Sequence, residues 1–189
     1  AVAALQTALS QSRIAGIETN LPYLRELIAT PVFAAGEVTT RTLETLVHRP
    51  ATMEVLAAGT QTTVQDYPGR IGYWAVGVPP SGPMDSRAFR LANRAVGNPE
   101  DAAALEFTMA GPTLKFHADA LICLTGAATA ATLDGTPVPF WRRVAADAGQ
   151  VLTVGNVQGA GCRGYLSVQG GIDVPPYLGS RSTFTLGNF

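Results

Sequence analysis

The stretch between Tyr67 and Met84 constrains this chain more than any other, because eight of its eighteen residues are proline or glycine. Proline locks φ and glycine frees it, so this mixture leaves little room for a regular strand or helix. Apolar residues in the same stretch, among them Tyr73 and Trp74, argue against disorder because such side chains are normally buried. We therefore expect a long ordered loop, and loops of this length in compact domains are commonly functional.

A helix is predicted directly after this loop. Asp85 is suited to be its N-cap, apolar residues recur at helical spacing from Ala88 to Val96, and Gly97 fits the C′ position.

Short extended runs dominate from Met53 onward. Gly, Pro and Asp separate them, and Asp134-Gly135 is typical of a two-residue hairpin because both residues tolerate positive φ. The pattern predicts a mainly β, antiparallel domain with one helix. The expected strands cover residues 53–58, 62–65, 104–110, 112–117, 120–126, 129–133, 137–140, 150–155 and 164–170.

The first 47 residues carry a different, helical pattern. Three short helices are expected, and their caps and stops are assigned to Gly16, Asn20, Pro31 and Thr39 or Thr40. So short a segment rarely buries enough surface to fold alone. Pro50 breaks the helical period, and we place a linker at residues 48–52 between a helical segment, 1–47, and a β domain, 53–189.

The charge, the apolar runs and the cysteines argue against a nucleic-acid-binding, membrane-spanning or metal-binding protein. The net charge of −1 provides no basic field for nucleic acid or an anionic membrane, and no apolar run approaches the roughly 20 residues of a membrane span. Cys123 and Cys162 are interpreted as small core residues, and no metal-ligand spacing is visible. We expect a cytoplasmic protein without a metal site of its own.

The helical segment resembles the end of a biotin carboxylase domain. The resemblance rests on Arg13-Ile14-x-Gly16-x-x-Thr19-Asn20, Tyr23-Leu24, Pro31-x-Phe33 and the following Gly36. It implies that this stretch follows an ATP-binding portion and contains none of its nucleotide-binding loop.

A longer resemblance covers about residues 53–189. VQDYPGRIGYWAVGVPPSGPMDSRAFRLANRAVGN, AALEFTMAGPTLKF, LTGA and GGIDVPPYLGSRST together resemble the carboxyltransferase domains of the urea carboxylase family. That family includes the second subunits of allophanate hydrolase-type proteins and a bacterial 5-oxoprolinase subunit. The resemblance implies a cyclophilin-like β barrel, here partial, and we expect the chain to be an inactive fragment of a larger enzyme.

The implied reaction transfers a carboxyl group from carboxybiotin to urea, which gives allophanate. Biotin is implied on a carrier domain absent from this chain, and ATP and Mg on an absent biotin carboxylase domain. A urea nitrogen is a poor nucleophile, so the site needs a proton acceptor and donors for developing negative charge. The acceptor candidates are Asp66, Asp85 and Glu106. The substrate-binding candidates are Gln65, Arg70, Tyr73, Ser81, Asn93, Arg181, Ser182 and Thr183, with Tyr73 or Trp74 against the biotin rings.

Several candidates have structural alternatives. Asp85 is equally suited to be only a helix cap, and Asp66 could stabilise its turn. Glu106 lies in an apolar run and needs a buried cationic partner, for which Arg70 is one choice. Asn93 is often a capping or surface residue in such a place.

Two alternatives of function stay open. Guanidine could replace urea as substrate. The β domain could also be a 5-oxoprolinase-subunit or regulatory binding module without carboxyltransferase activity.

Overall fold

A computed structural model describes all residues except 13, 15–18, 49–50 and 188–189. The chain divides into two compact units, residues 1–50 and residues 51–189. No helix in the described part of the chain is long and apolar enough to cross a bilayer.

The first unit is helical. Its elements are α1 (Val2–Gln11), α2 (Leu21–Ala29), α3 (Pro31–Ala35) and α4 (Thr42–Thr45). Polar side chains tie α2 to α1: Arg25 donates to the carbonyls of Leu9 and Ser12 at 2.9 and 2.6 Å, and Gln6 donates to the Ile28 carbonyl at 3.0 Å. Ile28 is the buried apolar residue of α2, so side chain to backbone contacts supplement a very small core.

The predicted helix ends of this unit need correction. Asn20 makes no side-chain cap bond; instead, the Thr19 hydroxyl accepts from the Leu21 amide at 3.3 Å. Pro31 ends α2 as predicted but also begins α3, with Thr30 as a cap that was not predicted. Arg41, rather than Thr39 or Thr40, is the N-cap of α4. The predicted stop at Gly16 lies outside the described residues.

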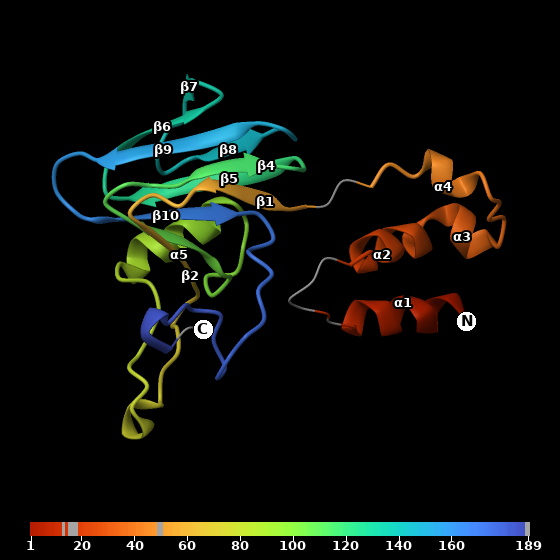
Figure 1. Cartoon of the computed structure of the whole chain (residues 1–189), viewed down its shortest axis with the longest axis horizontal. Coiled ribbons are helices and arrows are strands. Elements are labelled where there is room, and N and C mark those ends of the chain that lie inside the picture. The colour runs from red at the N-terminus through yellow and green to blue at the C-terminus, as the bar shows by residue number, and fades with distance from the viewer. Residues whose placement is uncertain (13, 15–18, 49–50, 188–189) are drawn as a thin grey trace. The chain divides into compact units, whose positions relative to one another are not determined.

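The second unit is built from two five-stranded antiparallel sheets (Figure 1), so the predicted mainly β fold is confirmed. The first sheet has the order β1-β4-β9-β6-β7, and the second has the order β2-β3-β10-β5-β8. The strands of the first sheet are β1 (Met53–Ala57), β4 (Thr113–Phe116), β6 (Thr129–Leu133), β7 (Thr136–Pro137) and β9 (Val151–Val157). Those of the second are β2 (Gln61–Gln65), β3 (Ala104–Thr108), β5 (Ala120–Gly126), β8 (Arg143–Ala146) and β10 (Arg163–Val168).

The two sheets enclose one hydrophobic core. Alternate residues of each strand point into it, because successive side chains of a strand face opposite sides. The largest of these buried residues are Leu105, Phe107, Leu114, Phe116, Ile122, Leu124, Leu152 and Leu166.

The predicted hairpin and helix are present. Asp134 and Gly135 both have positive φ, at 46° and 82°, and connect β6 to β7. The helix α5 (Ser86–Ala95) is capped by Asp85, and Gly97 has the expected positive φ of 80°. Figure 1 shows α5 against the second sheet, where Phe89 meets Tyr165 edge to face with ring centroids 5.9 Å apart.

Two strand assignments were wrong. Residues 137–140 were predicted as a strand, but β7 has two residues and ends at Pro137, whose ring lacks the amide hydrogen that a ladder needs. β8 was missed, because its sequence, RVAA, has too little apolar alternation to predict a strand on its own.

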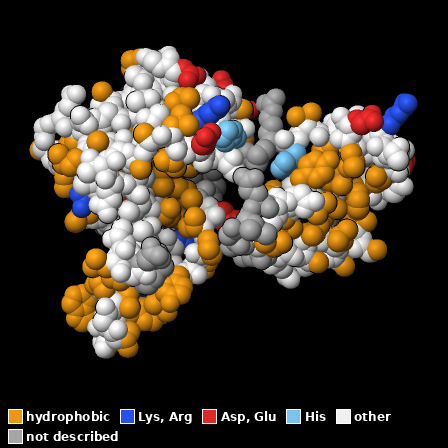
Figure 2. Space-filling model, viewed as in Figure 1, with side chains coloured by type: hydrophobic (Ala, Val, Ile, Leu, Met, Phe, Trp, Pro, Cys, Tyr) orange, Lys and Arg blue, Asp and Glu red, His pale blue; other side chains and the backbone are white. Residues whose placement is uncertain are grey.

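The proline- and glycine-rich stretch forms the predicted long loop, which projects from the body of the unit (Figure 1) and contains a 3₁₀ turn, η1 (Trp74–Val76). Its two arms meet at a narrow base. A Cβ on Gly69 would overlap the Ser81 carbonyl oxygen, and the Ser81 amide donates to the Arg70 carbonyl at 3.1 Å. Figure 2 shows apolar side chains covering the projection, where Trp74 and Val76 are 72% and 75% exposed, so the loop is ordered as expected but the expected burial of Trp74 was wrong.

Gly164→Ala should destabilise the second unit. Gly164 faces Phe107 across the β3–β10 ladder, and a Cβ there would overlap the Phe107 ring. Crowding of this kind costs roughly 1–3 kcal/mol. Denaturant unfolding followed by circular dichroism measures the change. Ala145→Ser, on an exposed position of β8, is the control and should be neutral; an unchanged midpoint for Gly164→Ala would contradict this packing.

The two thiols should differ in reactivity. Burial raises the pKa of Cys123 to about 11, whereas Cys162 is exposed, so the interpretation of Cys162 as a core residue was wrong. Because the thiolate is the reactive form, a chromogenic disulfide reagent at pH 8 should label one thiol in the folded chain and two in denaturant. Cys162→Ser should remove the fast reaction entirely, and rapid labelling that persists in this variant would contradict the burial of Cys123.

Candidate functional site

The outer face of the second sheet is divided between apolar and polar residues. Helix α5 covers Ala104 and Tyr165, and the Thr125 hydroxyl donates to the Ala88 carbonyl at 2.9 Å. The uncovered part consists of neighbouring positions on β2, β3 and β10. Thr63 pairs with Glu106, and Thr108 pairs with both Gln61 and Arg163.

This polar area forms the floor of an open pocket of about 200 Å³. Residues 80–82, from the base of the projecting loop, form one wall, and residues 183–185 form another. The complete lining is Gln61, Thr63, Gln65, Pro80, Ser81, Gly82, Glu106, Thr108, Arg163, Thr183, Phe184 and Thr185.

Glu106 accepts a hydrogen bond and forms an ion pair at the edge of the pocket. Its Oε2 accepts from the Met84 amide at 2.8 Å, and its Oε1 lies 3.4 Å from Nε of Arg163. The expectation that a carboxylate here needs a cationic partner is confirmed, but the suggestion that Arg70 is this partner was wrong. Arg163 lies next to Glu106 because β10, distant in sequence, pairs with β3.

Tyr165, on β10, contacts the same region and the end of the projecting loop. Its hydroxyl accepts from the Asp85 amide at 2.7 Å, and it faces Glu106 across the ladder. Burial is the main cause that raises the pKa of Tyr165 above its ordinary value, and the nearby carboxylates of Glu106 and Asp85 act in the same direction. The phenol therefore remains neutral at physiological pH and fixes the end of the loop without adding charge.

Asp66 holds the segment that forms the second wall. Its Oδ1 accepts from the hydroxyls of Ser180 and Ser182 at 2.5 and 2.7 Å, and its Oδ2 accepts from the Arg181 amide at 2.7 Å. The Asp66 amide also donates to the Ser182 hydroxyl at 3.0 Å. This set of contacts, which we call the Asp66 latch, satisfies a buried charge entirely from one short segment.

Arg70 reinforces the latch. It is 2% exposed, and its Nη2 donates to the carbonyls of Ser182 and Ser180 at 2.8 and 3.4 Å. Its Nε donates to the Tyr177 carbonyl at 3.1 Å, and its Nη1 to the Ser81 hydroxyl at 3.3 Å. The guanidinium thus links both walls of the pocket without lining it.

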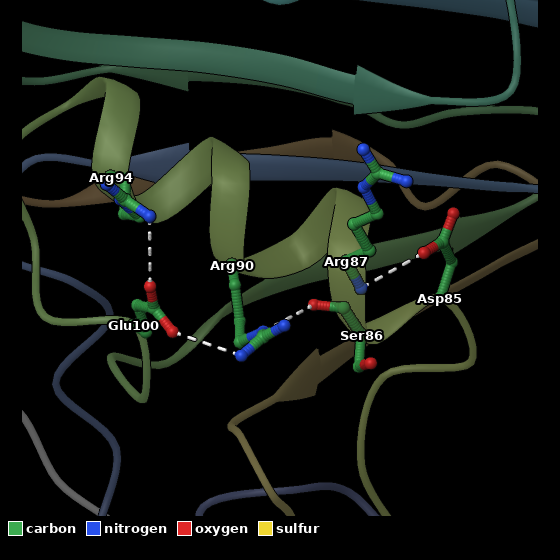
Figure 3. A network of polar contacts seen from close by, with 6 residues as sticks. All are labelled: Asp85, Ser86, Arg87, Arg90, Arg94 and Glu100. Atoms are coloured by element: carbon green, nitrogen blue, oxygen red, sulfur yellow. Dashed lines mark hydrogen bonds and ion pairs between the residues drawn. The ribbon is translucent and has the colours of Figure 1, made fainter.

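Asp85 is the helix cap (Figure 3): its Oδ1 accepts from the amides of Arg87 and Ala88 at 3.1 and 3.0 Å. After the end of α5, Glu100 turns back to the helix, where it accepts from Arg90 at 3.2 Å and lies 3.4 Å from Arg94. Asp85 does not line the pocket.

Asn93 is fully buried. Its Nδ2 donates to the Ala102 carbonyl at 2.8 Å, and its Oδ1 accepts from Asn98 at 3.2 Å. The Nδ2 of Asn98 also donates to the Val168 carbonyl at 2.8 Å. These amides join the end of α5 to the end of β10 and lie away from the pocket lining.

The structure brings together four of the predicted site residues, Gln65, Ser81, Glu106 and Thr183, around the pocket. Gln65 accepts from the Gly82 amide at 3.0 Å and so fixes the first wall. Asp66 and Ser182 belong to the latch instead, and Arg70 reinforces it. Arg181 donates to the Val174 carbonyl at 2.9 Å, and Tyr73 lies just before η1 in the projecting loop.

Eight lining residues were not predicted from the sequence: Gln61, Thr63, Pro80, Gly82, Thr108, Arg163, Phe184 and Thr185. Alternation of polar residues in β2 and β3 was available as a signal, since Gln61, Thr63 and Gln65 share one face of their strand. Arg163 carried no such signal, because its role depends on which strand lies beside β3.

Chemically, the pocket offers one carboxylate and one guanidinium 3.4 Å apart, with amide and hydroxyl groups around them. Such a set can hydrogen-bond both donors and acceptors of a small planar molecule.

Asp66→Asn should loosen the latch. An amide has one acceptor oxygen, so it cannot accept from both serine hydroxyls and the Arg181 amide, and loss of a charged buried hydrogen bond costs roughly 2 kcal/mol. Denaturant unfolding measures this cost, and hydrogen exchange at Arg181 and Thr183 should accelerate. Asp101→Asn, at an exposed turn position, is the matched control; equal stability of both variants would contradict the latch.

Comparisons with known proteins extend over the whole chain. It is 46% identical to urea amidolyase of Saccharomyces cerevisiae over 188 residues, covering 100% of this chain and 10% of that protein. It is 44% identical to a putative urea carboxylase of Emericella nidulans, covering 97% of this chain and 15% of that protein. A match to one of the 5-oxoprolinase subunits of Escherichia coli, at 45% identity, covers 69% of this chain and 42% of that protein.

Solved structures agree with these relatives. The crystal structure of the Kluyveromyces lactis urea carboxylase superimposes with a TM-score of 0.81 at 47% identity, over 96% of this chain and 16% of that one. The K. lactis urea amidolyase gives the same TM-score and identity, over 11% of its chain. The present chain therefore spans a small part of the proteins that it matches. Residues 76–189 match the family described as the carboxyltransferase domain, subdomain A and B. The chain belongs to this carboxyltransferase family and aligns with a portion of the urea amidolyase and urea carboxylase relatives.

Proposed function

We propose that the chain is part of a biotin-dependent urea carboxylase, an ATP-dependent ligase that transfers a carboxyl group from carboxybiotin to urea and produces allophanate. The observation that carries this proposal is the 46% identity to a urea amidolyase along the entire chain, helical unit included. The polar pocket at Glu106 and Arg163 is the place in this chain whose chemistry suits the reaction.

Glu106 is the predicted acceptor that lines the pocket, so we assign it the proton released by the attacking urea nitrogen. Asp66 and Asp85 were also candidates, but latch contacts occupy both oxygens of Asp66, and Asp85 caps α5. Gln65, Ser81 and Thr183 then orient the amides of a small substrate. Asp66, Arg70 and Ser182 position the walls that carry these groups.

The pocket residues fit the carboxylate end of carboxybiotin, because Arg163 and the surrounding amide and hydroxyl groups donate to a planar anion. When bound, carboxybiotin supplies the carboxyl group. Arg163 would hold the oxygens of this group, and Phe184 would provide an aromatic wall. Tyr73 and Trp74, which were expected against the biotin rings, lie in the projecting loop and do not line the pocket.

The domain assignment rests on the same identity. Residues 1–47 are the end of a biotin carboxylase domain, 48–52 a linker and 53–189 the first part of the carboxyltransferase domain. Biotin resides on a carrier domain, and ATP and Mg are used by the biotin carboxylase domain, both in the rest of the polypeptide. The enzyme acts in the cytoplasm, and this chain alone is inactive.

A second candidate is a 5-oxoprolinase-subunit or regulatory binding module. The 45% identity to a 5-oxoprolinase subunit favours it, although that match covers 69% of the chain rather than all of it. Purified full-length enzyme, supplied with ATP, bicarbonate and urea, distinguishes the two. Allophanate formation supports the carboxylase, and its absence in a biotin-charged enzyme favours the binding module.

Glu106→Gln in the full-length enzyme should lower the rate of urea carboxylation by about 10²-fold or more, because a proton acceptor is lost. ATP-dependent charging of biotin in the absence of urea should be unchanged. Glu54→Gln, on exposed β1, is the control and should retain activity. Loss of biotin charging together with carboxylation would instead indicate a general structural defect and contradict the assigned role.

A further inference from the structure

The pocket contains one pair of opposite charges. Among its twelve lining residues, Glu106 and Arg163 carry a formal charge, and the other ten are neutral. The side chains of Glu106 and Arg163 are 11% and 23% exposed, so bulk water screens them less than it screens surface charges. The lining side chains therefore carry a net charge close to zero, to which Glu106 contributes the negative charge and Arg163 the positive charge.

Arg163 is held beside the pocket from two sides. Its Nε faces Oε1 of Glu106 at 3.4 Å, and its Nη1 donates to the Sγ of Cys162 at 3.4 Å. Its backbone pairs with Thr108 on the pocket floor. The guanidinium is thus positioned where a molecule that contacts Glu106 also meets Arg163.

We infer that Arg163 determines specificity in this pocket and selects neutral planar amides, such as urea, over guanidinium cations. This inference rests on the proposed function and addresses the choice between urea and guanidine. Without Arg163, Glu106 would leave a net negative site that attracts a cation. With Arg163 present, that attraction is cancelled and a cation is repelled at short range.

Hydrogen bonding also favours urea over a guanidinium cation in this pocket. Urea has amide hydrogens for the Glu106 carboxylate and a carbonyl oxygen that accepts from the Arg163 guanidinium, whose five N–H groups also leave donors for the carboxyl group of carboxybiotin. A guanidinium cation has donors and no acceptor, so it cannot satisfy the donors of Arg163. Both charge and hydrogen-bond complementarity therefore depend on this one arginine.

The test uses full-length, biotin-charged enzyme and two substitutions of the same residue. Arg163→Gln removes the charge, whereas Arg163→Lys keeps the charge and loses the planar fork. Guanidinium chloride, at millimolar concentration, is measured as a competitive inhibitor of urea carboxylation and as an alternative substrate. The ratio of its inhibition constant to the KM for urea should fall about tenfold or more in Arg163→Gln and by less than about threefold in Arg163→Lys.

Arg142→Gln is the matched control, because Arg142 is exposed and does not line the pocket. It should leave the ratio unchanged, and ATP-dependent biotin charging should be equal in all three variants. Equal ratios in Arg163→Gln and wild type, or the same change in Arg163→Gln and Arg163→Lys, would overturn the inference.

A second variant covers the case in which Arg163→Gln does not fold. Glu106→Gln leaves Arg163 uncompensated, so equilibrium binding of acetate, a planar anion, should strengthen about tenfold relative to wild type. Unchanged acetate binding would also overturn the inference. Failure of the wild-type enzyme to make allophanate would overturn the proposed function, whereas normal allophanate formation with unaltered ratios would overturn the role of Arg163 alone.

Discussion

The Asp66 latch is the contact on which the pocket of this unit depends. One buried carboxylate receives two serine hydroxyls and a backbone amide from residues 180–182, more than a hundred positions away in sequence. Because the cost of burying a charge is offset only when its hydrogen bonds are made, this segment has one favourable position. Thr183 continues the segment by donating to the Val64 carbonyl at 2.8 Å, which places the second wall beside β2.

The division of the second sheet explains why a polar pocket exists beside a well-packed core. Helix α5 buries Ala88 and Phe89 against one half of the outer face, and the other half is left to the polar residues of β2, β3 and β10. Tyr165 lies at the border between the two halves. Its ring packs under α5, while its hydroxyl accepts from the Asp85 amide and fixes the end of the projecting loop.

Local signals in the sequence predicted local structure. Asp134-Gly135 and Asp85 specify a hairpin and a helix start through their own backbone preferences, so both were predictable, as was the mainly β fold. The roles of Arg163 and Asp66 depend on strand pairing and on a contact across more than a hundred residues, which a single sequence does not encode locally. The requirement for a cation beside Glu106 was predictable from burial, but the identity of that cation followed only from the register of β3 and β10.

The narrow base of the projecting loop separates the tip, whose length and sequence can vary, from the pocket wall formed by Ser81 and Gly82. Gly69 and Ser81 meet there through backbone atoms, and the Gly82 amide is fixed by Gln65 on the sheet. Residues between 71 and 79 therefore extend from an anchored base, and their number can change without displacing Ser81 or Gly82. Insertions, deletions and sequence drift at the tip are in this way uncoupled from the pocket wall, so related proteins could acquire different tips while they retain the same floor and walls.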